Sequence, residues 1–216
     1  MADTLPLNLP IVTSPAIASY DFTELATGLG FETFYAHGTK ETTSAVTYQL
    51  TPFSTIIWPN QVSKAVTTGG AQASATVDFD TSAFNLPRTA KGTAVVNFVW
   101  QGDAASSCNA YISAQILKVA SGGGTTAITS AKVRSRDTGT GGESALAAGE
   151  EENVLLFLPI TQTTIGVGEK LRLEIILTVV DFPRTVAYYF DPQGRNSVSN
   201  SDVSTQLKLL MPFRIN

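Results

Sequence analysis

Few side chains in this sequence could do nucleophilic chemistry. The 216 residues include a single histidine, His37, and a single cysteine, Cys108. A nucleophile needs a base beside it, so these two could form a Cys–His dyad only if folding brought them together. However, Cys108 opens an alternating apolar segment, which is typical of a small buried side chain. His37, in the sequence Ala36-His37-Gly38-Thr39, is more simply an exposed turn residue.

Carboxylates offer a second kind of chemistry. Asp78 and Asp80 are two residues apart, and Glu174 lies within a later apolar segment. Paired carboxylates could hydrolyse glycosides, and Asp78 with Asp80 could help to hold Ca²⁺. Residues two apart share one face of a strand, so the simpler interpretation is a solvent face opposite Val77 and Phe79. We expect no catalytic residue, no metal site and no cofactor, and we predict that the protein is not an enzyme.

Two other patterns resemble binding sites. Residues 166–170 (GVGEK) contain two glycines but lack the Gly-Lys-Ser/Thr ending of a phosphate loop, and they precede an apolar strand pattern. They are therefore expected to form a hairpin turn. Tyr188, Tyr189 and Trp100 could stack on sugars, although aromatic residues of a β-sandwich are typically part of its core.

Charge and cysteine content exclude several classes of protein. Fourteen basic and eighteen acidic residues give a net charge of −4, which argues against a nucleic-acid partner. Residues 150–152 (EEE) are interpreted as a solvated loop or a strand-edge charge cluster. The sequence shows no secretion signal and no apolar segment of membrane-spanning length, so we expect synthesis in a host cytoplasm and no membrane contact.

The elements that would position these side chains are strands. From Phe31 onward apolar residues alternate with polar ones, and Gly-rich turns separate the segments. The clearest segments are 46–50, 75–79, 94–100, 171–179 and 207–215. No helical crossover pattern is present, so we predict an all-β fold, specifically an antiparallel jelly-roll-type β-sandwich. Segments 154–158 and 173–177 are apolar on both faces, which predicts burial on the reverse side as well.

The predicted organisation is one domain preceded by an arm. Residues 1–19 contain three prolines among scattered apolar residues, which favours an extended N-terminal arm. Residues 20–216 are assigned to a single β-sandwich domain. Residues 19–25 (SYDFTEL) carry a weak capping signal for one short helical turn.

Several stretches together resemble a family of uncharacterised β-rich structural proteins of tailed, mostly aquatic phages. They are SYDFTE (19–24), GFETFY (30–35), DFDT (78–81), FNLPRT (84–89), KGTA (91–94), LPITQT (158–163), GEKLRL (168–173), DPQGRN (191–196) and PFRI (212–215). The resemblance covers most of the chain after residue 19. It implies a place in the virion and no defined activity.

The leading functional prediction is a capsid decoration or cement protein that bridges and stabilises neighbouring capsid subunits. Its partners would be the major capsid protein or other virion proteins, and by analogy with decoration proteins at threefold positions we expect a homo-oligomer, specifically a trimer. The candidate contact residues are Leu5, Leu7, Leu9, Ile11, Phe84, Leu86, Arg88, Phe213, Arg214 and Ile215. The alternative is a glycan- or receptor-binding module of a tail fibre or spike, using loops 181–184 or 197–202 with Tyr188 or Tyr189.

Overall fold

The computed structural model describes residues 29–39, 46–54, 63–69, 72–139, 143–180, 183–193 and 205–214, and all regular structure in them is β. The twelve strands are β1 (Leu29–Thr39), β2 (Thr47–Thr51), β3 (Ser63–Thr67), β4 (Ala73–Thr81), β5 (Arg88–Gln101), β6 (Ala110–Val119), β7 (Thr125–Ala127), β8 (Lys132–Arg136), β9 (Glu151–Ile165), β10 (Lys170–Val179), β11 (Thr185–Tyr189) and β12 (Lys208–Arg214). The predicted all-β fold is confirmed. The predicted arm and helical turn lie outside the described residues.

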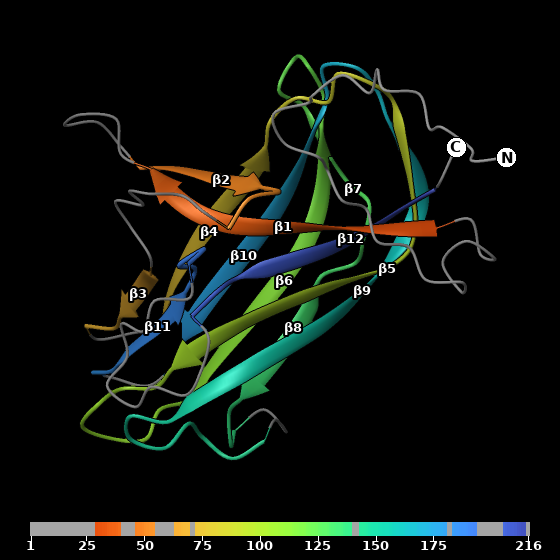
Figure 1. The fold of residues 1–216 in the computed structure, drawn as a ribbon. Helices are drawn as coiled ribbons and strands as arrows, with labels where there is room; N and C mark the ends of the chain where they lie inside the picture. The colour runs from red at the N-terminus through yellow and green to blue at the C-terminus, as the bar shows by residue number, and fades with distance from the viewer. Residues whose placement is uncertain are drawn as a thin grey trace, which may run out of the picture.

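The strands form one continuous sheet that folds over itself into a sandwich (Figure 1). Its order is β3-β11-β5-β12-β1-β2-β4-β10-β6-β7, with β9 paired to β5 and β8 paired to β6. One layer contains β9, β5, β12 and β1, and the other contains β4, β10 and β6. The pairing is antiparallel except between β2 and β4, where Gln49 pairs with Asp80 and Leu50 with Thr81 in parallel.

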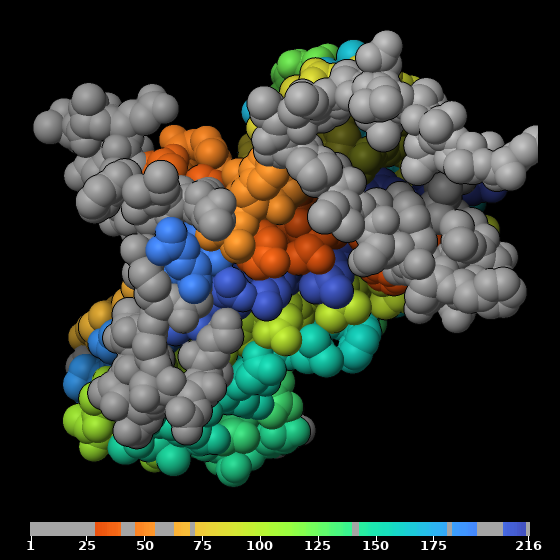
Figure 2. All heavy atoms as spheres, in the orientation of Figure 1, coloured from red at the N-terminus to blue at the C-terminus, as the bar shows by residue number. Residues whose placement is uncertain are grey.

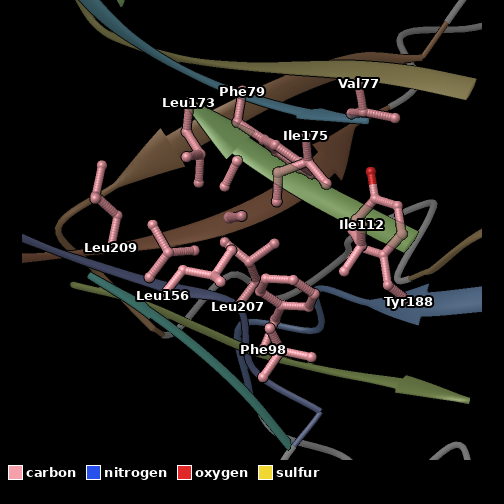
Figure 3. Close-up of a cluster of buried hydrophobic side chains, with 14 of the residues drawn as sticks. Val77, Phe79, Phe98, Ile112, Leu156, Leu173, Ile175, Tyr188, Leu207 and Leu209 are labelled. Atoms are coloured by element: carbon pink, nitrogen blue, oxygen red, sulfur yellow. The ribbon is translucent and has the colours of Figure 1, made fainter. Parts of the chain in front are cut away.

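The core lies between the two layers and follows the alternation of the sequence. Ala94, Val96, Phe98 and Trp100 of β5 are fully buried, and so are the apolar residues at every second position of β10 from residue 171 to 179. In Figure 3 the side chains of β4 and β10 point toward those of β5, β9 and the segment leading into β12. Burial of one such aliphatic side chain contributes about 1.5–3 kcal/mol.

A seam between β8 and β9 nearly closes the sheet. Beside this seam the connection between β7 and β8 bonds to β9, because the Thr161 amide donates to the Ile128 carbonyl at 2.9 Å. Further along, charged side chains fill the seam: Arg134 donates to Glu152, and Trp100 Nε1 donates to Glu152 Oε2 at 2.8 Å.

The acidic run at residues 150–152 lies at the start of β9, an edge strand that pairs with β5 alone among the described strands, which agrees with the strand-edge prediction and not with a solvated loop. Glu151 and Glu152 are the first residues of β9, and Glu150 accepts two hydrogen bonds from Arg136 at 2.7 and 2.8 Å. The run supplies the acidic half of an ion-pair cluster that joins β8 to β9, because Arg134 and Arg136 on β8 supply the basic half.

Candidate binding surfaces

Phe84 and Phe213, predicted to contact other proteins, pack inside the domain. Phe213 is 6% exposed and belongs to the core, and Phe84 lies edge-on to it with ring centroids 6.1 Å apart. The guanidinium of Arg88 lies 5.0 Å from the centroid of the Phe213 ring and pairs with Glu32. Phe84 and Phe213 therefore pack within the domain, and their contact with another protein stays a prediction.

The other predicted contact residues have mixed positions. Leu86 is 74% exposed, next to the Phe84–Phe213 cluster in sequence, and Arg214 is exposed at the end of β12. Leu5, Leu7, Leu9, Ile11 and Ile215 lie outside the described residues. The structure thus leaves Leu86, Arg88 and Arg214 as the accessible members of the predicted set.

His37 and Cys108 do not form a dyad. His37 lies within β1, where it pairs with Gln49 of β2, and is 2% exposed rather than in an exposed turn. Neither of its ring nitrogens has a hydrogen-bond partner among the described residues, Cys108 included. Burial lowers the pKa of His37, because the charged imidazolium loses its hydration. Cys108 is fully buried, as the sequence predicted.

Asp78 and Asp80 lie on an outer face of the sandwich, where Arg172 of β10 holds both. Arg172 Nε donates to Asp80 Oδ1 at 2.6 Å, and another guanidinium nitrogen donates to Asp78 Oδ2 at 2.8 Å. Hydrogen bonding to Asp80 and the charges of both carboxylates raise the pKa of Arg172. The Arg172 guanidinium occupies the place that a metal ion would take between the two carboxylates. Asp78, Asp80 and Arg172 therefore form an ion-pair bridge between β4 and β10. The described part of the chain holds no group of three or more metal-ligating side chains.

A cavity of about 340 Å³ adjoins this ion-pair bridge where β2 runs beside β4. Its lining comes from β2, from the end of β4 and the two residues after it, and from the first residue of β10. The polar lining residues include Thr47, Gln49, Asp80, Thr81, Ser82 and Lys170, and Tyr48 and Leu50 line the cavity as well. Sequence reasoning missed this site, because the parallel pairing of β2 with β4 leaves no local signal.

The other layer carries an apolar surface, here called the outer apolar face, made of Phe31, Val95, Leu155, Phe157 and Leu210. Phe157 pairs with Val95, and Val95 pairs with Leu210, so these side chains form a row across β9, β5 and β12. The exposed fractions of Phe31, Leu155 and Phe157 are 47%, 48% and 55%. In Figure 2 the outer sides of β1, β12, β5 and β9 follow one another as bands of red-orange, dark blue, yellow-green and teal.

The outer apolar face includes the reverse side of segment 154–158. Because this segment is apolar on both faces, the sequence predicted that both faces would be buried. Val154, Leu156 and Leu158 are buried, whereas Leu155 and Phe157 are exposed. The described residues of this chain therefore do not supply that second burial.

The aromatic residues considered for sugar stacking are buried. Trp100 and Tyr188 are 0% exposed, and Tyr189 is 8% exposed and donates its hydroxyl hydrogen to Gln101 Oε1 at 2.6 Å. These rings are unavailable to a ligand, which corrects their predicted glycan-binding role. Residues 181–182 and 197–202 of the predicted loops lie outside the described residues.

No protein-family model and no curated protein matches this sequence. Among solved structures, a CocE/NonD family hydrolase from Staphylococcus aureus is similar at 14% identity, with a TM-score of 0.50 over 86% of this chain and 36% of the hydrolase. An α-amino acid ester hydrolase is similar at 9% identity, with a TM-score of 0.54 over 85% of this chain and 36% of that enzyme. A structure of carbohydrate-binding modules from the β-sandwich superfamily gives a TM-score of 0.39 at 10% identity, over 76% of this chain and 55% of that chain.

The hydrolase matches contradict the prediction that this protein is not an enzyme, because the fold it shares with them occurs in hydrolases. The chain spans about a third of the length of these hydrolases. At such low identity the likeness shows the fold alone, and it assigns no activity or substrate to this chain. Among the described residues, no helix is long and apolar enough to span a membrane.

Proposed function

We propose that this chain is a virion structural protein that attaches to neighbouring virion proteins, the capsid subunits first among them, through its outer apolar face. The observation that carries the proposal is the row of accessible apolar side chains centred on Phe157 and Leu155. The resemblance of the sequence to virion structural proteins supports the same role. Decoration of the capsid as a homotrimer is the specific form of the proposal.

The two outer faces of the sandwich differ in a way that favours a protein partner. The outer side of β4 and β10 carries Asp78, Asp80, Arg172 and Glu174, which suit contact with water. The corresponding side of β9 carries leucine and phenylalanine at alternate positions, Leu155 and Phe157. Clustered exposed apolar residues typically mark interaction surfaces, and aromatic residues are enriched at their centres.

The construction of this face suits a rigid attachment. β5 pairs with β9 along its whole length on one edge, and with β12 and β11 on the other. The backbone is thus fixed before a partner arrives, so little conformational entropy is lost on binding. A protein that binds only assembled shells stabilises them by mass action, which is how a cement protein would act.

The test is cosedimentation with undecorated capsids of the phage that encodes the protein. Phe157→Ser combined with Leu155→Ser should weaken binding by about tenfold or more, since central apolar contacts dominate interfaces. Val167→Ser is the matched control, because Val167 is 65% exposed in the turn between β9 and β10 and is not one of the residues of the outer apolar face. The control should bind like the wild type, and the mass of the free protein would give its oligomeric state.

Two results would contradict the proposal. If the double variant binds shells as tightly as the wild type, the outer apolar face is not the attachment surface. If the wild type does not bind shells at all, the decoration role fails, and necks and tails become the next targets.

A further inference from the structure

The cavity between β2 and β4 contains polar groups whose hydrogen-bonding capacity is unused. The amide of Gln49 and the ammonium of Lys170 both line it, and neither side chain makes a hydrogen bond or ion pair with the described residues. The hydroxyls of Thr47 and Ser82 lie in the same lining. A cation, an amide and hydroxyls therefore face one space with no partner from the described chain.

Asp80 is the one carboxylate among the described residues of this lining, and its position is fixed. Arg172 donates to both of its oxygens, at 2.6 and 2.9 Å. Its charge is therefore offset by a guanidinium, while its oxygens can still accept further hydrogen bonds. Because Arg172 offsets the charge of Asp80, the unpaired charge in the described lining is the positive charge of Lys170. A ligand that complements it would be negatively charged.

We propose that this cavity binds a sugar unit that carries a carboxylate, as uronic and sialic acids do. The carboxylate would pair with Lys170, and the ring hydroxyls would hydrogen-bond with Gln49, Ser82 and Asp80. A volume of about 340 Å³ lies within the usual range of small-molecule sites, roughly 300–1,000 Å³. A single ammonium suits a monoanion better than a phosphate, which typically recruits a guanidinium or several backbone amides.

This site is distinct from the tyrosines and loops predicted from the sequence for glycan binding. It also shares no residue with the outer apolar face, so it does not depend on the proposed attachment to virion proteins. An acidic polysaccharide on a host surface is a natural source of such a sugar unit.

The experiment is titration of the full-length protein by NMR or calorimetry with glucuronic acid, N-acetylneuraminic acid, glucose and acetate. At least one acidic sugar should bind more tightly than both glucose and acetate. Lys170→Met keeps the apolar stem and removes the charge, so it should weaken binding of the acidic sugar by about tenfold or more.

Two further variants separate the cavity from the ion-pair bridge. Asp80→Asn removes a lining carboxylate and one partner of Arg172, whereas Asp78→Asn removes the other partner of Arg172 outside the lining. Asp80→Asn should weaken sugar binding and Asp78→Asn should leave it unchanged, with thermal melting used to verify that each variant is folded.

Three results would overturn the proposal. They are the absence of saturable binding by both acidic sugars, binding of acetate as tight as that of the sugars, and wild-type affinity in Lys170→Met. The second result would indicate an anion site without sugar recognition.

Discussion

His37 is an ionisable side chain held in a place that suits only its neutral form. It is 2% exposed, and neither ring nitrogen has a hydrogen-bond partner in the part of the chain that the structure describes. Burial lowers its pKa below the ordinary value of 6.5. Protonation of the folded protein therefore costs free energy that protonation of the unfolded chain does not.

We predict that this residue makes the protein less stable in weak acid. Above pH 6.5 the imidazole is neutral in both states and has no effect on the pH dependence. As the pH falls through 6.5, the unfolded chain binds a proton that the folded protein excludes. The free energy of unfolding then decreases by up to about 1.4 kcal/mol per pH unit until the lowered pKa of the folded state is reached.

Urea denaturation of the wild type and His37→Leu between pH 7.5 and 5 measures this effect. The chain has no other histidine, so the difference between the two slopes reports His37. The variant should lack the decrease. Equal slopes in the two proteins would show that His37 reaches solvent or a partner when it is charged.

The burial of a single residue could be predicted where it follows the alternation of a strand. The role of a residue was harder to predict where it depends on a side chain far away in the sequence. Cys108 is buried as expected, whereas the turn-like sequence around His37 lies within a long strand. Asp78 and Asp80 do share an outer face, but their pairing with Arg172 joins residues more than ninety positions apart. Such a pairing leaves no trace in the local pattern.

At the scale of elements, the seam between β8 and β9 relies on side chains for most of its closure. The side chains of Arg134 and Glu152 are 28% and 17% exposed, and Trp100 Nε1 also donates to Glu152. Hydrogen bonds to a partly buried carboxylate are among the stronger ones in proteins. This cluster therefore couples two strands that have no backbone ladder between them.

We predict that Arg134→Met destabilises the protein by about 1–3 kcal/mol, because Glu152 keeps its charge and loses its nearer basic partner, which leaves Arg136 at 4.0 Å. Adding Glu152→Gln should recover part of the loss, since the amide oxygen still accepts from Trp100 and the partly buried charge is removed. Urea denaturation of the single and double variants provides the measurement. A double variant less stable than Arg134→Met would contradict this account.

The strands themselves were largely predictable, and their neighbours were not. Alternation correctly marked β4, β5, β10 and β12 and the buried face of each, because the period of two is a property of the single strand. The pairing of β1 with β12, and the parallel contact of β2 with β4, depend on how the whole sheet folds over. The candidate cavity lies at that parallel contact, so it too could not be predicted.

At the scale of the whole molecule, β12 completes the sandwich from the end of the sequence. It lies between β1 and β5 and pairs with both, and Leu207, Leu209 and Met211 are fully buried. Without it, two strands would lose a ladder and the core would lose a row of side chains. Contacts between distant parts of the chain also favour slow folding.

We predict that a chain ending at residue 204 does not unfold cooperatively. A synthetic peptide of residues 205–214 should restore a cooperative transition by adding the missing strand. Removal of residues 215–216 alone is the control and should leave the melting curve unchanged. Thermal melting by circular dichroism decides the matter, and a cooperative melt of the shorter chain near the wild-type temperature would contradict the prediction.

The pairing of Leu29 with Arg214 has a further consequence. It places the first and last described residues next to each other, on one rim of the sandwich. The same fold is therefore compatible with a permuted gene, in which the old ends are joined and the chain opens at another rim, such as the hairpin at residues 166–168.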